Sequence, residues 1–114
     1  MPYTITLKKK FSAAHFLRGY KGKCEELHGH NYLIVVHITS KQLPKSGMVY
    51  DFKEIKDYLD KILPDHKLLN KVYKFNPTTE NLAKHFFEMI KKKYPVIKIE
   101  IWEDENQGSS YSNK

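Results

Sequence analysis

The sequence is poor in the residues from which several common kinds of site and segment are built. Its single cysteine, Cys24, excludes an intrachain disulfide and any metal site that needs several cysteines. The longest strongly apolar run, 32–36, stops at His37 and is far short of the ~20 residues that a membrane-spanning helix requires. The start of the chain lacks the basic region and apolar stretch of a secretory signal, so we expect a cytoplasmic protein with no membrane partner.

Basic side chains outnumber acidic ones by 20 to 13 and give a net charge of +7 at pH 7. Such an excess favours an anionic partner, which can be a nucleic acid, an acidic surface or a phosphorylated small molecule. Arg18 is the only arginine, however, and the pattern contains no basic helix. A nucleic-acid-binding module with a structural metal is therefore a disfavoured alternative of another functional class.

Apolar spacing predicts a single domain over residues 1–114, of α+β class. The predicted elements are strand, strand, helix, helix and strand, with bounds near 4–16, 30–39, 51–63, 77–90 and 96–103. A bulge at the lysines of the first strand and a further short strand at Met48–Tyr50 are compatible with the pattern. We expect an antiparallel sheet with two helices packed on one face, and a polar, mobile tail from about residue 106.

Each predicted helix has a start signal and an apolar stripe. Asp51 can accept a hydrogen bond from a first-turn amide while Glu54 reaches back to it, and Thr78 can cap the second helix. The two stripes comprise Phe52, Ile55, Leu59, Ile62 and Leu63, and then Leu82, Phe86, Met89 and Ile90.

The last predicted strand ends on an unusual residue. Ile97, Ile99 and Ile101 share one face by the period of two, and Glu103 should point the same way. An acidic side chain at the end of an apolar face is unusual.

His28-Gly29-His30 is the sharpest local signal for chemistry. Residues two apart in an extended segment project to the same side, so both imidazoles can face one point, and glycine removes bulk between them. If the first two strands pair, His15 is the natural third ligand. Three imidazoles leave a fourth position open, as in catalytic zinc sites, although iron or another divalent ion fits the same set. The alternative is a pair of surface histidines beside a turn.

Two further groups are candidates for proton transfer. Cys24 follows Lys23 on a glycine-flanked loop, where a nearby cation and metal would favour the thiolate, and Glu25 follows it directly. In Asp65-His66 a carboxylate next to an imidazole suits a proton relay, although adjacent side chains often point apart and such a pair by itself is more often structural. His37 and His85 are expected to be structural.

Several of these fragments occur in one order and together resemble a known family. They are Phe11-Ser12-Ala13-Ala14-His15, Cys24-x-x-x-His28-Gly29-His30-Asn31-Tyr32, Gly47-Met48-Val49-x-Asp51-Phe52, Asp65-His66-x-x-Leu69-Asn70, Pro77-Thr78-Thr79-Glu80-Asn81-Leu82-Ala83 and Trp102-Glu103. Over residues 5–105 the chain is similar to the 6-pyruvoyl-tetrahydropterin synthase and 6-carboxytetrahydropterin synthase family.

The resemblance implies the tunnelling fold, in which subunits pool their sheets into a barrel as trimers or hexamers, with active sites between subunits. It implies zinc as the cofactor, with metal ligands that match His15, His28 and His30. The catalytic cysteine of the family matches Cys24, and its relay matches Asp65 and His66. The acidic residue that anchors the pterin ring matches Glu103, which can accept two hydrogen bonds from the guanidine-like edge. Thr79 and Glu80 match a segment near the pterin pocket.

The activity that the resemblance implies is a lyase reaction in tetrahydropterin biosynthesis. 7,8-Dihydroneopterin triphosphate would be converted to a 6-pyruvoyl- or 6-carboxy-tetrahydropterin with loss of triphosphate, and lysines at the pocket mouth would hold the phosphates. The chain departs from the usual pattern at Pro64, where leucine is common, and at Glu25. Relatives with a glutamate three residues before the first histidine resemble enzymes of folate-type synthesis, so an aldolase-like cleavage to 6-hydroxymethyl-dihydropterin is the alternative.

Overall fold

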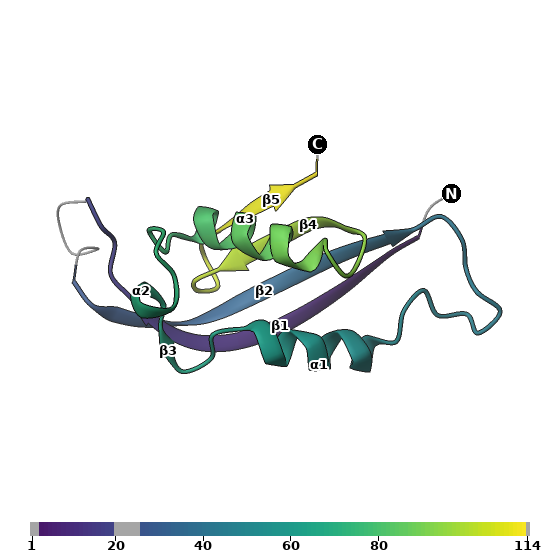
Figure 1. Ribbon diagram of the computed structural model, residues 1–114, viewed down its shortest axis with the longest axis horizontal. Coiled ribbons are helices and arrows are strands. Elements are labelled where there is room, and N and C mark those ends of the chain that lie inside the picture. The colour runs from purple at the N-terminus through teal and green to yellow at the C-terminus, as the bar shows by residue number, and fades with distance from the viewer. Residues whose placement is uncertain (1–2, 20–25, 114) are drawn as a thin grey trace.

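A computed structural model describes residues 3–19 and 26–113 of the chain (Figure 1). Its elements are, in order, β1 (Tyr3–His15), β2 (His28–Ser40), α1 (Phe52–Ile62), β3 (Lys67–Leu68), α2 (Leu69–Val72), α3 (Thr79–Ile90), β4 (Val96–Trp102) and β5 (Gly108–Ser112). The strands form one sheet in the order β3-β1-β2-β4-β5. None of the helices in the described ranges is long and apolar enough to cross a membrane.

The longest strand pairing in the sheet is that of β1 with β2. The two strands are antiparallel and pair without interruption from Tyr3 opposite Ser40 to His15 opposite His28, so β1 has no bulge at its lysines. Alternation along β1 buries Leu7, Phe11 and His15 on one face. The same register fixes which side chains of β2 share that face with them.

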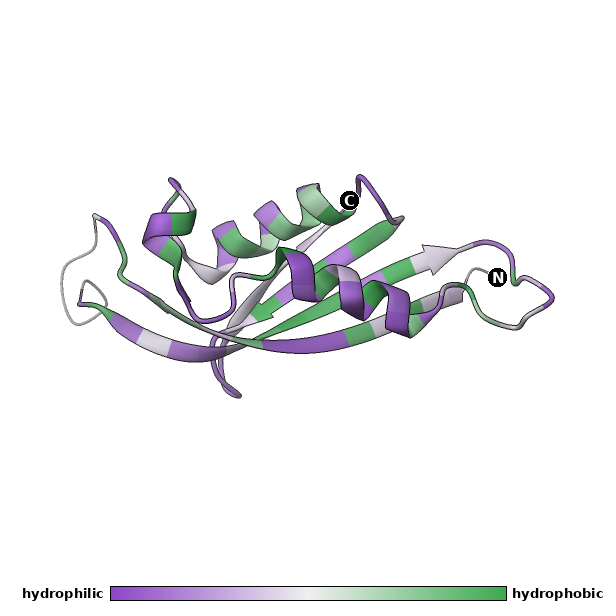
Figure 2. Cartoon of the chain, turned by 60° about the horizontal axis from the view of Figure 1, so that its bottom comes forward, coloured by the Kyte–Doolittle hydropathy of each residue, from purple (hydrophilic) through white to green (hydrophobic). Residues whose placement is uncertain are grey.

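Both long helices cover this face, as the sequence predicts, and one apolar core lies between them and the sheet (Figure 1). Asp51 caps α1 by accepting from Lys53 N, and Thr78 caps α3 by accepting from Asn81 N. The outward side of α1 is hydrophilic (Figure 2). The largest fully buried side chains include Tyr32, Ile34, Ile38, Ile55, Leu59, Leu69, Leu82, Phe86, Ile90, Ile99 and Ile101.

Two details of the helices differ from the sequence prediction. Glu54 does not complete a capping box, because its carboxylate accepts a hydrogen bond from the Tyr94 hydroxyl at 2.8 Å. Phe52 is 53% exposed and does not join the core, and it lines a surface pocket with the start of β1 and residues 47–50.

The sheet is mixed, not purely antiparallel as expected. β3 runs parallel to β1 and pairs with it at Ala13 and Ala14, and α2 follows β3 directly. Residues 48–50 form no strand, and residues 49 and 50 are bends. Elements as short as β3 and α2 carry no readable periodicity, which is why the sequence did not reveal them.

The tail is the largest departure from the sequence prediction, because it contains β5. This strand pairs with β4 from Gly108 opposite Trp102 to Ser112 opposite Lys98. The Tyr111 ring packs edge-on against Phe87 of α3, with ring centroids 5.2 Å apart. Main-chain pairing, the aromatic contact and the hydroxyl contact between Ser109 and Thr79 therefore hold a segment whose polar composition suggested a mobile tail.

β4 does not alternate as cleanly as its sequence suggests. Ile38 pairs with Val96 and His37 with Lys98, so Ile97 is an extra residue in a bulge. Val96 takes the buried position in place of Ile97, while Ile99 and Ile101 stay in the core. Because of the extra residue, Val96 on one side of the bulge and Ile99 on the other both face the core.

His85 on α3 packs as a structural residue, in line with the sequence prediction. Its ring lies 4.6 Å from the Tyr73 centroid, and burial lowers the pKa of its imidazole from the usual 6.5. Protonation therefore favours the unfolded state, so the free energy of unfolding should fall as pH drops below about 6.5. We expect His85→Phe to reduce this acid loss, measured by urea unfolding at pH 7 and pH 5. An unchanged slope would contradict the assignment.

Candidate metal centre and active site

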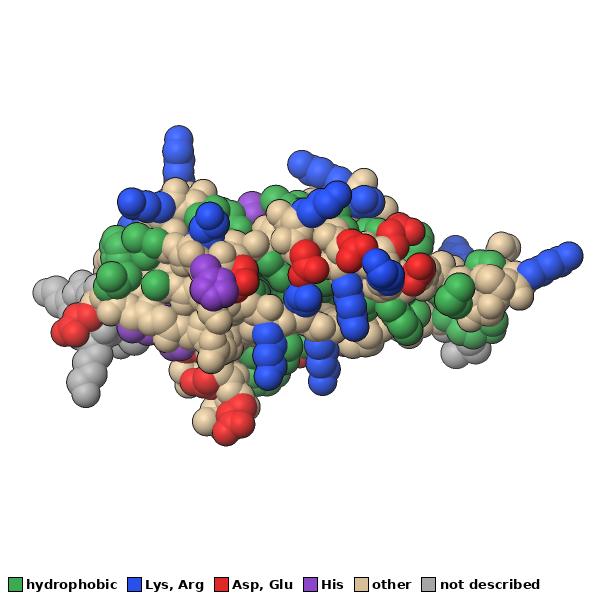
Figure 3. Space-filling view, turned by 90° about the horizontal axis from the view of Figure 1, so that it is seen from below, with side chains coloured by type: hydrophobic (Ala, Val, Ile, Leu, Met, Phe, Trp, Pro, Cys, Tyr) green, Lys and Arg blue, Asp and Glu red, His purple; other side chains and the backbone are tan. Residues whose placement is uncertain are grey.

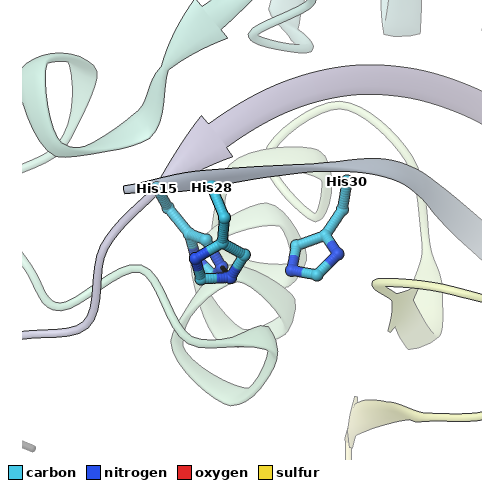
Figure 4. A group of neighbouring side chains, drawn as sticks. All are labelled: His15, His28 and His30. Atoms are coloured by element: carbon cyan, nitrogen blue, oxygen red, sulfur yellow. Dashed lines mark hydrogen bonds between the residues drawn. The ribbon is translucent and has the colours of Figure 1, made fainter. Parts of the chain in front are cut away.

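Three histidines converge at one end of the sheet (Figure 4). The register places His15 of β1 opposite His28 of β2, and His30 follows on the same face two residues later. Nε2 of His15 lies 3.0 Å from Nε2 of His28, and one ligand atom from each of the three rings falls within 4.8 Å of the others. The cluster that sequence reasoning predicted is thus formed within a single chain.

Backbone carbonyls orient two of these rings. His15 Nδ1 donates to the carbonyl of Pro77 at 2.8 Å, and His28 Nδ1 donates to that of Glu26 at 2.7 Å. Since a carbonyl can only accept, both protons sit on Nδ1, and Nε2 is left as the free ligand atom in the neutral ring. The Tyr32 hydroxyl lies 3.2 Å from His15 Nδ1 and adds a second contact. Such outer contacts fix the tautomer of metal-binding imidazoles.

The donor set fits a divalent metal ion. Burial lowers the pKa of His15, which favours the neutral form that binds metals. Two neutral Nε2 lone pairs at 3.0 Å repel each other unless a cation lies between them. Within the described residues, His30 Nε2 is buried and has no hydrogen-bond partner. Three imidazole nitrogens that lack other partners form the open site to which zinc binds in enzymes.

Glu103 lies next to this cluster. Its Oε1 is 3.6 Å from His30 Nε2, and its side chain is 21% exposed. Leu33 of β2 pairs with Trp102, the last residue of β4. Glu103 follows directly and therefore projects to the face that carries Tyr32 and the histidines. The sequence prediction for its direction therefore agrees with the structure, although the strand itself ends at Trp102.

Asp65 and His66 contact each other, with 3.0 Å between Oδ2 and Nδ1. Asp65 Oδ1 also accepts from Ser12 N at 2.8 Å, and this bond, together with the His66 charge, holds the pKa of the carboxyl below its usual value. His66 has a φ of +59° and its side chain is 82% exposed. Seen from below, the protein shows a histidine beside a carboxylate on its surface (Figure 3).

This pair does not face the metal-binding imidazoles. His66 lines a pocket beside the paired segments 12–14 of β1 and 29–31 of β2. Of the residues that line it, Ser12, Ala14 and Asn31 have side chains on the face of the sheet opposite to the imidazoles, whereas Ala13 and His30 belong to the imidazole face. The Ser12 hydroxyl donates to Asn31 Oδ1 at 2.7 Å, which confirms that these two side chains share a face. One chain therefore presents the two halves of the predicted machinery in different directions.

Thr79 and Glu80 lie in the first turn of α3. The Thr79 hydroxyl is 2.6 Å from that of Ser109 on β5 and 3.2 Å from Glu80 Oε1, so it links the helix start to the last strand. Pro77, two residues earlier, binds His15 through its carbonyl. Cys24 and Glu25 lie outside the described residues.

Sequence reasoning missed several residues that support the site. Ser12 and Pro77 act through main-chain atoms, which leave no side-chain signal, and Gln107 contacts Glu103 only because a hairpin brings them together. Tyr32 could have been found, since it lies two residues after His30 and shares its face.

Comparison with known proteins agrees with this geometry. The family described as 6-pyruvoyl tetrahydropterin synthase matches residues 4–114. A 6-carboxy-5,6,7,8-tetrahydropterin synthase of Rickettsia bellii is 33% identical, over 89% of this chain and 94% of that protein. A dihydroneopterin monophosphate aldolase of Pyrococcus furiosus is 34% identical, over 95% and 96% of the two chains.

A solved structure gives the same result for the fold. The 6-pyruvoyl tetrahydropterin synthase of Caenorhabditis elegans superposes with a TM-score of 0.88 at 30% identity, covering 100% of this chain and 97% of that one. The family match over nearly the whole chain, the relatives and this superposition lead to one conclusion: the chain belongs to the 6-pyruvoyl tetrahydropterin synthase family.

Proposed function

We propose that the protein is a zinc-dependent lyase that acts on 7,8-dihydroneopterin triphosphate. Elimination of triphosphate gives a 6-pyruvoyl-tetrahydropterin, and elimination of triphosphate with uptake of water and loss of the two outer side-chain carbons as an aldehyde gives a 6-carboxy-tetrahydropterin. The observation that carries the proposal is the convergence of three imidazoles beside the Glu103 carboxylate. This arrangement supplies a metal site and a ring-binding group side by side. Family membership supports the pterin as substrate, and the net charge of +7 suits a phosphorylated one.

Each candidate residue has a defined task in this reaction. Glu103 accepts two hydrogen bonds from the guanidine-like edge of the pterin. When bound at the imidazoles, zinc supplies a Lewis acid that lowers the pKa of the hydroxyls on the substrate side chain. Cys24 as thiolate accepts a proton from a side-chain carbon, and His66, held by Asp65, delivers or removes another. Thr79 and Glu80 border the ring pocket.

A second copy of the chain completes the site in this proposal. Asp65 and His66 lie at the β3 edge of the sheet, outside the cluster of three imidazoles, and His66 borders side chains of the opposite face such as Ser12 and Asn31. In this proposal one chain therefore does not bring both groups to a single substrate. An oligomer in which the relay of one subunit faces the metal site of the next removes this difficulty. A trimer or hexamer whose sheets close into a barrel is the assembly that we expect.

The second candidate is an aldolase-like cleavage of dihydroneopterin, or of its phosphate, to 6-hydroxymethyl-dihydropterin. Two observations favour it: Glu25 lies three residues before His28, and the relative from Pyrococcus furiosus is named a dihydroneopterin monophosphate aldolase. In this reading Glu25 takes part in proton transfer in place of Cys24 or together with it.

The test is incubation of the zinc-loaded protein with dihydroneopterin triphosphate, its monophosphate and free dihydroneopterin, with products identified by mass. We expect a pyruvoyl- or carboxy-pterin from the triphosphate. 6-Hydroxymethyl-dihydropterin would instead establish the aldolase candidate. Cys24→Ala and Glu25→Ala, assayed on each substrate, separate the two mechanisms: unchanged turnover in Cys24→Ala removes the thiolate from the lyase reaction.

A further inference from the structure

Gln107 contacts Glu103 twice across the hairpin between β4 and β5. Its side-chain Nε2 donates to Glu103 Oε2 at 2.5 Å, and its carbonyl accepts from Glu103 N at 3.1 Å. The other carboxylate oxygen, Oε1, lies 3.6 Å from His30 Nε2. The carboxylate is therefore held at one oxygen by an amide and faces the metal-binding cluster with the other.

The hairpin gives Gln107 little freedom. Asp104 Oδ1 accepts from Asn106 N at 2.8 Å and from Gln107 N at 3.0 Å, which closes a tight turn. Gly108 follows and pairs with Trp102. A Cβ on Gly108 would meet Ile101 O at 2.5 Å and Trp102 Cδ2 at 2.8 Å, so no side chain fits there. Gln107 is thus placed by the turn before it and by the close strand contact after it.

We propose that Gln107 is a positioning residue that orients the Glu103 carboxylate for a ligand with adjacent N–H donors, such as a pterin ring. The inference rests on the proposed function, because it takes Glu103 as the group that binds the ring. An ionised carboxylate only accepts, and its two oxygens offer about four lone-pair directions. Gln107 takes one of them and leaves enough for a bidentate ligand. A carboxylate that is already oriented binds with a smaller loss of side-chain entropy.

The test measures the binding of oxidised neopterin, a fluorescent pterin without phosphate, to the zinc-loaded protein. We expect Gln107→Ala to weaken binding roughly tenfold, the usual scale for loss of a hydrogen bond to a charged group. Gln107→Glu keeps the shape but faces Glu103 with a second carboxylate, so it should weaken binding further. Gln42→Ala, at an exposed glutamine just after β2, is the matched control and should bind as the wild type does.

Kinetics separate positioning from a merely structural role. If Gln107 only orients the ring anchor, KM for the pterin substrate rises in Gln107→Ala while kcat stays within about twofold. Equal neopterin binding by wild type and Gln107→Ala would overturn this inference and leave the proposed function intact. A loss of bound zinc or of thermal stability in Gln107→Ala would also overturn it, because the hairpin would then be structural. A wild-type protein that binds no pterin would overturn the proposed function and this inference together.

Discussion

His28→Ala should lose the bound metal and nearly all turnover. His28 supplies one of the three converging nitrogens, and among the described residues the group has no fourth member. The Glu103 carboxylate lies beside His30 and is the proposed anchor of the ring. Loss of an outer partner of a metal ligand already costs roughly 10–100-fold in affinity, so loss of a ligand should cost more. Without the Lewis acid, turnover should fall by roughly 10³-fold, which corresponds to several kcal/mol of transition-state stabilisation. Metal content by mass spectrometry and product formation by chromatography provide the two readouts.

His37→Ala is the matched control for this prediction. His37 lies on the same strand, but its ring bonds to Glu100 at 2.6 Å on the other face of the sheet. We expect this variant to keep its metal. If His28→Ala retained stoichiometric zinc with wild-type affinity, the three-histidine site would be refuted. Removal of the metal from the wild type with a chelator should abolish activity, and addition of zinc should restore it.

Mixed oligomers of two inactive variants should regain activity. His28→Ala lacks a metal ligand and His66→Ala lacks the relay, so each is expected to be inactive by itself. If each site combines the imidazoles of one subunit with the relay of its neighbour, a one-to-one mixture rebuilds some intact sites. With random mixing, the subunit that supplies the imidazoles is intact there with probability one half, and so is the neighbour that supplies the relay. About one quarter of the sites should therefore work in a closed ring with head-to-tail contacts.

The experiment uses co-expression of the two variants with different affinity tags, followed by purification on both tags in succession. Wild-type chains carrying the same two tags set the full activity. After selection on both tags, one of the three sites in every mixed trimer is intact, so recovery near one third supports a shared site in a trimer, and recovery near one quarter supports it in a hexamer of two such rings. His28→Ala mixed with His30→Ala is the negative control because both lesions lie in the same half. No recovery in proven mixed oligomers, or a monomeric wild-type protein, would contradict the proposal.

The site was predictable where a short sequence period controls geometry. His28 and His30 share a face because they are two apart in a strand, and His15 joins them because the neighbouring strand ends opposite. Glu103 was predictable for the same reason, although the bulge at Ile97 changes which residue of β4 is buried. The fold class and the starts of both long helices followed from apolar spacing and capping residues.

The missed elements share a physical cause, since distant partners stabilise them. β5 consists of Gly, Ser and Tyr residues with little strand signal, and it exists because β4 offers a free edge and Phe87 offers a surface for Tyr111. Glu54 was expected to bond within its own helix, but Tyr94 lies within reach and donates to it. Glu54 and Tyr94 are 40 positions apart, and a local sequence pattern does not predict contacts over such a separation.

The sequence by itself determined the class of the fold, the three metal-binding candidates and the direction of Glu103, because alternation and helical spacing act within one element. Only the tertiary structure decided where the Asp65–His66 pair points and what holds Glu103 in place. The first depends on the parallel pairing of β3 with β1 and the positive φ of His66, and the second on the hairpin that brings Gln107 to the carboxylate. Local periodicity assigns faces to an element, whereas long-range backbone pairing decides which faces meet.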